Sequence, residues 1–265
     1  MSGTAPGPRL PDVNVMEGGG VRYMHFDTPW IQGAMRVDAP DEIELDYVQR
    51  MMVWMLFRDE AEVTRGHAVQ LGLGAATLTR FCHKRLKMRT TAVELNPRVI
   101  AACRQWFGLP RESARLAVLE MDAGAWVADP MNRDTADVLS VDLYDQEAAR
   151  PVLDSADFYR DCRAVLDDGG VMTVNLFGRR SSFPLSFARV VEAFGAEQVH
   201  ALKPTPEGNT IVVAMKHVTV PGRDVLARRA ENIETRWHLP ARKWLRMLSS
   251  LPADAPASLP ESPPA

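Results

Sequence analysis

The sequence predicts an α/β protein in which helices cover both faces of a largely parallel sheet, behind a small antiparallel β domain. Three observations predict this class. From His67 onward, short apolar strands alternate with helical stretches, the pattern that produces a parallel sheet. The first of these strands ends in the glycine turn Gly72-Leu73-Gly74, and a helix follows. Before position 43, by contrast, β-like runs are separated by turn residues.

The first 42 residues divide into a polar start and a β-like segment. Residues 1–11 are largely polar and contain Gly and Pro, so we expect a disordered N-terminus. Residues 12–42 hold three β-like runs, the first two separated by the turn-forming Glu17-Gly18-Gly19-Gly20. We expect them to form a small antiparallel β domain. The runs are Val13–Met16, Val21–Phe26 and Trp30–Met35.

Residues 43–220 are expected to form the main, nucleoside-binding domain. Apolar side chains recur at helical spacing from Ile43 to Phe57, which predicts a helix there. Pro97 suits the first turn of a later helix, where a missing amide hydrogen costs little. The predicted strands are Ala68–Leu73, Thr91–Glu94, Leu116–Leu119, Val138–Asp142, Val171–Leu176, Glu197–Leu202 and Thr210–Met215, the last two as a closing hairpin. The predicted helices are Thr77–Leu86, Pro97–Trp106, Ala123–Ala128, Ser155–Leu166 and Pro184–Phe194, and Asp167–Gly170 is a predicted turn.

The C-terminal part is helical and basic, and then loses its periodicity. Residues 221–250 carry seven Arg or Lys against three acidic residues. Trp237, Trp244 and Leu248 give these helices an apolar stripe, so we expect them to cover a hydrophobic edge or to make oligomer contacts. Residues 251–265 are rich in Pro, Ala and Ser and are expected to be a disordered tail.

Composition excludes several classes of function. The chain has 265 residues and a net charge of −3, so no global field attracts nucleic acid or an anionic membrane. No apolar run approaches the length of a membrane-spanning helix, and the start lacks a secretory pattern. Six histidines show no metal-ligand spacing. Three widely spaced cysteines fit buried thiols in a reducing compartment. We therefore expect a cytoplasmic protein without a metal site, a membrane segment or a nucleic-acid partner.

The glycine turn is the first motif that points to chemistry. In Leu71-Gly72-Leu73-Gly74-Ala75, small residues at a strand-to-helix turn let the backbone approach a nucleotide-like ligand. Thr77 stands where the dinucleotide fingerprint has its third glycine, which argues against a pyrophosphate-containing dinucleotide. A tight turn that binds no ligand would also explain these glycines.

Acidic residues follow the next strands at the same edge. Glu94 comes twenty positions after Gly74, where an acid accepts hydrogen bonds from the ribose hydroxyls. Asp122 follows the third predicted strand, and its carboxylate can accept from an adenine amine, although an acid here can also cap a helix. Asp142 and Asp145 close the fourth strand. Open α/β sheets bind ligands at the carboxyl ends of their strands, so these acids together predict a nucleoside site.

At this point the chain resembles the spermidine synthase (polyamine aminopropyltransferase) family. The resemblance rests on Gly72-Leu73-Gly74-Ala75, Val93-Glu94-Leu95-Asn96, Asp122-Ala123 and the Asp142-x-x-Asp145 pair, with Ile31-Gln32 and Tyr47 upstream. It covers roughly Val13 to Lys216. The family has a Rossmann-like class I methyltransferase fold behind a small N-terminal β domain. The resemblance therefore implies this fold, a homodimer, and aminopropyl transfer from decarboxylated S-adenosylmethionine to a polyamine amine.

The resemblance also implies roles for individual residues on the donor side. Gln32 would contact the nucleoside, Glu94 the ribose hydroxyls, and Asp122 with Ala123 the adenine. Gly72 and Gly74 would let the backbone approach the co-substrate.

On the acceptor side, the resemblance implies a base and a cleft. Asp142 would orient and deprotonate the acceptor amine, Asp145 would hold a second cationic amine, and Tyr47 would line the cleft. A protonated amine has no lone pair, so a nearby carboxylate base is the group that the chemistry needs. Displacement at a carbon beside a positively charged sulfur needs no metal.

Three departures from the family pattern leave other functions open. Ala75 stands where the family has an aspartate that binds the donor's amine, Val48 where it has a glutamine, and Thr205 where it has a tyrosine. Without the acid at position 75, ordinary S-adenosylmethionine becomes as plausible a donor as its decarboxylated form. The alternatives are therefore an S-adenosylmethionine-dependent methyltransferase and a non-catalytic relative that binds a nucleoside.

Overall fold

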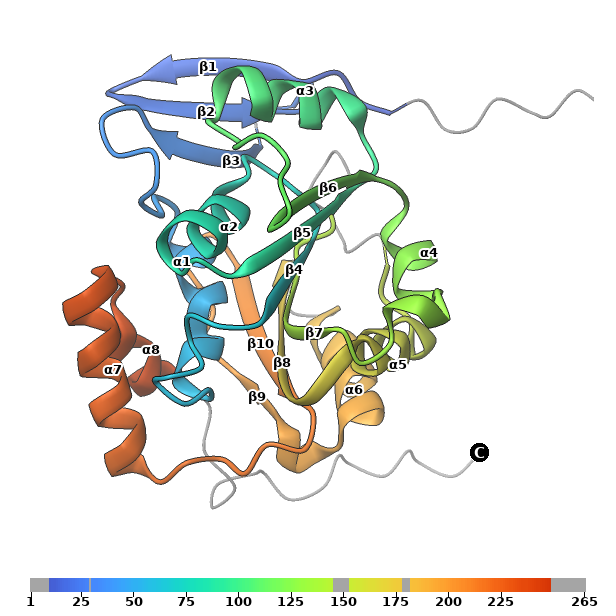
Figure 1. The fold of residues 1–265 in the computed structure, drawn as a ribbon, viewed down its shortest axis with the longest axis vertical. Helices are drawn as coiled ribbons and strands as arrows, with labels where there is room; N and C mark the ends of the chain where they lie inside the picture. The colour runs from blue at the N-terminus through green and yellow to red at the C-terminus, as the bar shows by residue number, and fades with distance from the viewer. Residues whose placement is uncertain (1–9, 29, 145–152, 178–181, 249–265) are drawn as a thin grey trace, which may run out of the picture.

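A seven-stranded sheet forms the centre of the molecule (Figure 1). The structure is a computed structural model, and it describes residues 10–28, 30–144, 153–177 and 182–248. The strand order is β6-β5-β4-β7-β8-β10-β9; the first five are parallel, and β10 runs antiparallel to both of its neighbours. The strands are β4 (His67–Leu71), β5 (Arg89–Glu94), β6 (Leu116–Glu120), β7 (Ala136–Val141), β8 (Leu166–Phe177), β9 (Val199–Ala201) and β10 (Asn209–Met215).

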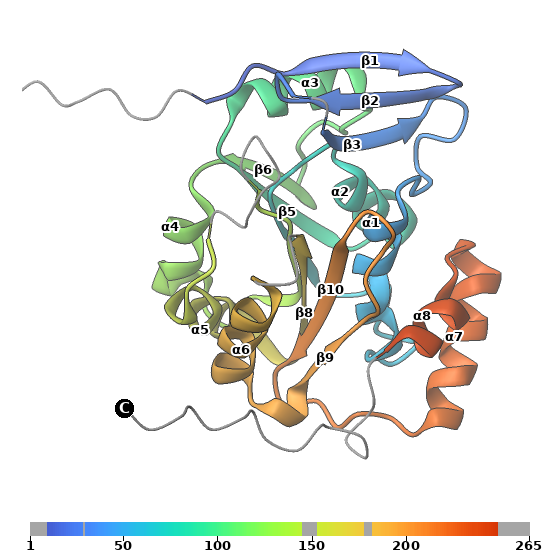
Figure 2. The same ribbon diagram turned by 180° about the vertical axis from the view of Figure 1, so that it is seen from behind.

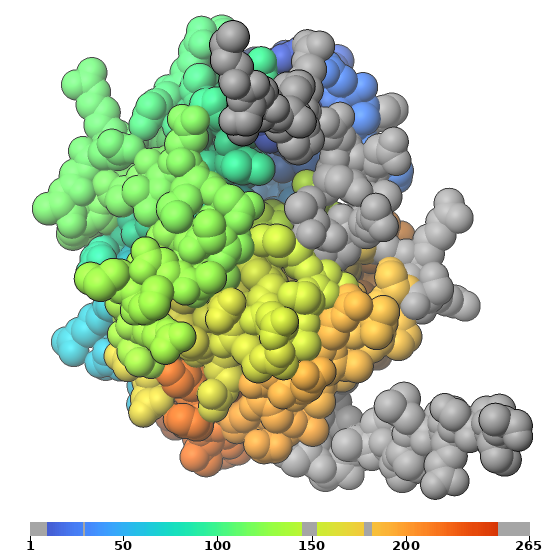
Figure 3. All heavy atoms as spheres, turned by 90° about the vertical axis from the view of Figure 1, so that its right-hand side faces the viewer, coloured from blue at the N-terminus to red at the C-terminus, as the bar shows by residue number. Residues whose placement is uncertain are grey.

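Helices cover both faces of this sheet, as the alternating pattern predicts. Side chains of β7 alternate between two cores: Val138 faces one core and Leu139 the other. Figure 3 shows the first helical layer as neighbouring lime, yellow and orange patches, formed by α4 (Ala123–Ala128), α5 (Ala156–Val165) and α6 (Phe183–Phe194). The other face carries α1 (Asp46–Met51), α2 (Thr77–Arg80), α7 (Arg223–Trp237) and α8 (Ala241–Met247).

A separate three-stranded antiparallel sheet precedes the main sheet, with the order β1-β2-β3. Its strands are β1 (Asn14–Gly18), β2 (Val21–His25) and β3 (Ile31–Arg36), and it lies next to α3 (Pro97–Trp106) (Figure 1). Met24 and Met35 pack with Val99 and Phe107 in a third core. The small sheet is therefore attached to the strand-to-helix turns of the main sheet.

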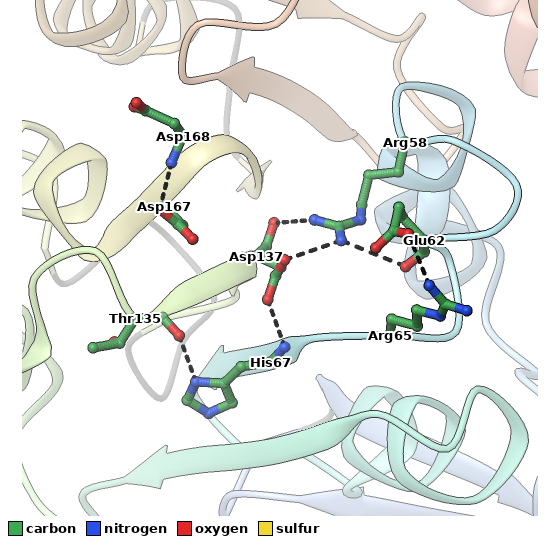
Figure 4. A network of polar contacts seen from close by, with 8 residues as sticks. All are labelled: Arg58, Glu62, Arg65, His67, Thr135, Asp137, Asp167 and Asp168. Carbon is green, nitrogen blue, oxygen red and sulfur yellow. Dashed lines mark hydrogen bonds and ion pairs between the residues drawn. The ribbon is translucent and has the colours of Figure 1, made fainter.

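A polar network lies at the amino-terminal ends of β4 and β7, opposite those turns (Figure 4). The backbone N–H of His67, at the start of β4, donates to Asp137 Oδ2 at 2.7 Å, and Arg58 Nη2 lies 3.0 Å from Asp137 Oδ1. The His67 ring bonds to the carbonyl of Thr135 at 2.8 Å. Gly66 has φ +81°, and a Cβ there would lie 2.1 Å from Asp137 Oδ2. These contacts set where β4 and β7 begin.

Three local structures differ from the sequence prediction. The predicted helix from Ile43 to Phe57 is only α1 followed by a 3₁₀ helix, η1 (Met52–Leu56). All of η1 is buried between the sheet and the C-terminal helices, so the packing from all sides determines its form. The predicted helix Thr77–Leu86 continues after α2 as a π-helix, η2 (Phe81–Arg85). The predicted turn Asp167–Gly170 is part of β8, because Gly169 and Gly170 pair with the backbone of Lys216.

Short 3₁₀ turns complete the described elements. They are η3 (Pro130–Asn132) and η4 (Ala196–Gln198), the second of which takes up the start of the predicted strand Glu197–Leu202. β9 and β10 nevertheless pair antiparallel, so the closing hairpin is confirmed.

The C-terminal helices complete the core beside η1. Figure 2 shows α7 and α8 on the same side of the molecule as α1. Trp244 is fully buried, and Trp237 and Ile233 pack with it in the same core. Arg229 Nη1 donates to the carbonyl of Leu56 at 3.1 Å. The apolar stripe of these helices therefore covers η1.

We expect Trp244→Ala to lower the free energy of unfolding by about 3–5 kcal/mol, because truncation of a fully buried aromatic side chain leaves a cavity. Urea denaturation followed by circular dichroism measures the change. The exposed Arg246 on the same helix provides the control, and Arg246→Ala should stay within about 0.5 kcal/mol of the parent. Equal effects of the two changes would contradict the covering role of α8.

Candidate active site

The backbone conformation of the turn after β4 requires glycine at positions 72 and 74. Gly72 and Gly74 have φ of +84° and +50°, and Ala76 is also left-handed at +56°. A Cβ on Gly72 would lie 2.2 Å from the carbonyl oxygen of Asp142, far inside van der Waals contact. The N–H of Asp142 also donates to the carbonyl of Leu71 at 3.0 Å. The end of β7 is thereby held against the turn.

The small N-terminal sheet closes over this turn from the other side. A Cβ on Gly33 would lie 2.6 Å from the Cβ of Ala75, so the two backbones are in direct contact. Thr77 Oγ1 donates to the carbonyl of Ala34 at 3.2 Å. Gln32 is half-buried, and its Nε2 has no hydrogen-bond partner among the residues that the structure describes. A nucleoside acceptor atom would satisfy that orphaned donor.

Ala75 stands in this turn where the family pattern has an aspartate. Its side chain is buried and packs against Gly33 of β3. Position 75 therefore supplies no carboxylate to the turn.

Glu94 connects the glycine turn to the end of β5. Its Oε2 accepts from the N–H of Leu73 at 2.8 Å, and its Oε1 accepts from the N–H of Asn96 at 2.8 Å. Burial raises the pKa of Glu94, and the bonds from the backbone amides partly offset that effect. Each oxygen keeps an acceptor site, so the carboxylate can still receive two ribose hydroxyls.

Asp122 begins α4, and the structure gives it the capping role as well. Its Oδ1 accepts from the N–H of Ala125 at 2.8 Å, and the side chain is exposed. Ala123 is buried beside it. The second carboxylate oxygen of Asp122 accepts no hydrogen bond from a described residue, so its adenine contact stays a prediction.

Asp142 follows β7 and is held by two side-chain contacts. Its Oδ1 accepts from Asn175 Nδ2 at 2.9 Å, and the hydroxyl of Tyr47 lies 3.4 Å from its Oδ2. Burial raises the pKa of Asp142, and the two hydrogen bonds act in the opposite direction. Burial and the neighbouring carboxylate raise the pKa of Tyr47 well above its usual value, so Tyr47 is a neutral donor. Sequence analysis singled out each of these two residues separately, and the structure places their side chains in contact.

Asp145, the partner acid predicted for a second amine, lies outside the described residues. Its role stays a prediction.

Sequence analysis missed the two asparagines behind Asp142. Asn175 on β8 donates to Asp142, and its own Oδ1 accepts from Asn209 Nδ2 at 3.1 Å. Both are buried. The available signal was a polar residue inside the apolar run Val171–Leu176, but only the pairing of β8 with β10 brings Asn209 to it.

Aromatic side chains at the ends of β7 and β8 are a second feature that sequence analysis did not predict. The ring of Phe177 lies 5.9 Å from that of Trp30 and 6.2 Å from that of Tyr144, both edge-on. The hydroxyl of Tyr144 donates to the carbonyl of Asn175 at 2.6 Å and accepts from the N–H of Phe177. Tyr144 therefore ties the residues after Asp142 to β8.

Two searches of the described residues bear on other kinds of site. None of the helices in these ranges is both long and apolar enough to cross a membrane. Across residues 10–28, 30–144, 153–177 and 182–248, His, Cys, Asp and Glu form no cluster of three or more that could hold a metal ion. The three cysteines are buried free thiols.

Comparisons with solved structures identify the fold. No protein-family model matches the chain. A probable spermidine synthase from Corynebacterium glutamicum superposes with a TM-score of 0.71 at 17% identity over 99% of both chains. The spermidine synthase from Thermotoga maritima gives 0.61 at 16% identity over 88% of this chain and 84% of its own. Human methyltransferase-like protein 13, solved in complex with SAH, gives 0.66 at 21% identity over 74% and 93%. The fold is therefore that of spermidine synthases and class I methyltransferases.

Sequence relatives then narrow this class to one family. The polyamine aminopropyltransferase of Neisseria meningitidis is 31% identical over 249 residues, 93% of this chain and 91% of the relative. That of Chromobacterium violaceum is 29% identical over 232 residues, 87% and 86% of the two chains. The chain belongs to the polyamine aminopropyltransferase family, and it is a transferase.

We expect Glu94→Gln to weaken methylthioadenosine binding by roughly tenfold or more, since a hydrogen bond to a charged group contributes about 1.5–3 kcal/mol. Isothermal titration calorimetry measures the dissociation constant. Glu120→Gln is the matched control, because Glu120 is the register partner of Glu94 on β6 and is exposed. If both variants bind like the parent, Glu94 does not hold the ribose.

Proposed function

We propose that the protein transfers an aminopropyl group from decarboxylated S-adenosylmethionine to an amine of a small polyamine. The observation that carries this proposal is Asp142: a half-buried carboxylate at the carboxyl end of β7, in contact with the glycine turn and held by Tyr47 and Asn175. Membership of the aminopropyltransferase family supports the reaction class.

In the proposed mechanism, the donor side binds an adenosine. Glu94 accepts the two ribose hydroxyls, Gln32 donates its orphaned amide hydrogen, and Asp122 with Ala123 borders the adenine. Gly72 and Gly74 present backbone without side chains, so the ligand can approach closely. Holding both substrates in one geometry supplies a large part of the rate, up to about 7–11 kcal/mol in favourable cases.

On the acceptor side, Asp142 is the base. The acceptor arrives as an ammonium, and Asp142 takes one of its protons, which leaves a nitrogen lone pair. That lone pair forms a bond to the methylene carbon next to the donor's sulfur. The carbon–sulfur bond breaks, and its electron pair stays on sulfur as a neutral thioether. Burial raises the pKa of Asp142 toward the operating pH, which favours a general base.

The aromatic group of Trp30, Phe177 and Tyr144 supports a cationic acceptor, because ring faces attract ammonium groups. Asp145 would hold a second amine of the polyamine. We further propose a homodimer in the cytoplasm. Residues 12–42 would close over the donor, residues 43–220 would bind both substrates, and residues 221–250 would cover the core.

Methyl transfer from S-adenosylmethionine is the second candidate. The observation that favours it is Ala75, which is buried against Gly33 and leaves no carboxylate to bind a donor amine or to repel a donor carboxylate.

We expect Asp142→Asn to abolish aminopropyl transfer and to leave methylthioadenosine affinity within a few-fold of the parent, because the base acts on the acceptor. A transfer assay and calorimetry measure the two effects. Asp129→Asn is the matched control and should leave both quantities unchanged, because Asp129 is a half-exposed residue that caps η3. Turnover that survives Asp142→Asn would overturn the base assignment.

A titration of the parent protein with three nucleosides separates the candidate functions. We expect decarboxylated S-adenosylmethionine to bind more tightly than S-adenosylmethionine, with methylthioadenosine as the common reference. Preference for the carboxylated donor would instead favour methyl transfer. No heat with any of the three would contradict both reactions and favour a relative that has lost nucleoside binding.

A further inference from the structure

Three buried polar side chains follow one another behind Asp142. Asn175, Thr205 and Asn209 are 3%, 5% and 8% exposed. Asn175 lies on β8, and Asn209 begins β10, the antiparallel neighbour of β8. Thr205 and Asn209 close a short turn, in which the N–H of Thr205 donates to the carbonyl of Asn209 at 2.8 Å. Buried polar groups of this kind cost stability unless each is hydrogen-bonded.

The hydrogen bonds from side chain to side chain in this row all donate toward Asp142. Thr205 Oγ1 accepts from the backbone N–H of Asn209 at 3.2 Å, and its hydroxyl hydrogen donates to Asn209 Oδ1 at 3.4 Å. The amide of Asn209 is thereby oriented with Nδ2 toward Asn175 Oδ1, at 3.1 Å. Asn175 in turn directs its Nδ2 to Asp142 Oδ1, at 2.9 Å. If the Asn175 amide turned over, its carbonyl oxygen would face a carboxylate oxygen.

We propose that Thr205, Asn209 and Asn175 form a hydrogen-bond relay that holds Asp142 oriented and ionised for the acceptor. The relay rests on the proposed function, in which Asp142 is the base. The three side chains are positioning residues, since each acts through Asp142.

The relay offsets the effect of burial on Asp142. Burial raises the pKa of this carboxyl, and the bond from Asn175 is the larger of the two contacts that lower it; Tyr47 provides the other. Among the described residues, the titratable groups that face this region are Tyr47 on α1, whose hydroxyl donates to Asp142, and Tyr144 beyond β7, whose hydroxyl donates to the carbonyl of Asn175. Asn175 is therefore the contact whose orientation decides how readily Asp142 loses its proton.

The C-terminal helices hold the far end of the relay. Arg50 Nη1 donates to the carbonyl of Lys203 at 2.7 Å, and the N–H of Lys203 donates to the carbonyl of Met247 at 2.9 Å. Leu202 and Leu248 form an antiparallel bridge beside this contact. The segment that leads into Thr205 is thus fixed between α1 and the end of α8. This contact gives the basic C-terminal segment a place in the site.

Two variants of the full chain test the relay. Asn209→Leu removes the donor to Asn175, and Thr205→Val removes the hydroxyl that orients Asn209. In both, the acidic limb of the kcat/KM profile should move to higher pH by about half to one unit, the shift that loss of one neutral hydrogen bond corresponds to. Thr173→Val is the matched control: Thr173 is also buried on β8, but its hydroxyl pairs with Ser140. Its acidic limb should not move.

Carbon-13 NMR of the Asp142 carboxyl separates failure of the relay from failure of the proposed function. The signal is assigned by its loss in Asp142→Asn. A midpoint that rises in Asn209→Leu and in Thr205→Val, but not in Thr173→Val, supports the relay whether or not the parent transfers an aminopropyl group. An unchanged midpoint in either folded variant overturns the relay, even if Asp142→Asn has abolished turnover. If one variant fails to fold, the other decides by the same criterion.

Discussion

The contact between Gly72 and Asp142 is the constraint on which the site depends. The two residues end neighbouring parallel strands, and the glycine Cα lies so close to the Asp142 carbonyl that any side chain would collide with it. This contact brings the glycine turn after β4 and the Asp142 carboxylate after β7 together at the carboxyl ends of the strands. At their other ends, where the same two strands begin, the hydrogen bond between His67 and Asp137 holds them together. The register of β4 and β7 is thus determined at both ends.

The two half-buried acids, Glu94 and Asp142, are stabilised in different ways. Glu94 receives backbone N–H groups from Leu73 and Asn96, and the sheet and its turns fix those donors in place. Asp142 receives side-chain donors, which rotate unless something orients them. Burial raises the pKa of both carboxyls. Asp142, whose donors can rotate, is therefore the acid that has the buried polar side chains Asn175, Asn209 and Thr205 behind it.

The sequence predicted the parts of the molecule that local patterns determine. The parallel strands and the glycine turn follow from periodicity and spacing, and spacing or resemblance singled out Glu94, Tyr47 and Asp142. The contact between Tyr47 and Asp142 came only from the structure. The 3₁₀ helix at Met52–Leu56 could not be predicted from local patterns, because its form depends on packing from all sides. The role of Asn209 could not be predicted either, since it depends on the pairing of β8 with β10. Asp122 shows a third case: the structure gives it the helix cap, and that leaves its ligand role open.

The departures from the family pattern have different physical meanings on the two sides of the site. At the glycine turn, Ala75 is buried against Gly33 of β3, and no carboxylate comes from this position. On the acceptor side, Thr205 replaces a long aromatic side chain by a short hydroxyl that bonds to Asn209. The polar group is kept, but it now acts on Asp142 through other side chains. A position-by-position comparison counts both changes as losses, whereas only the first removes a polar group from the site.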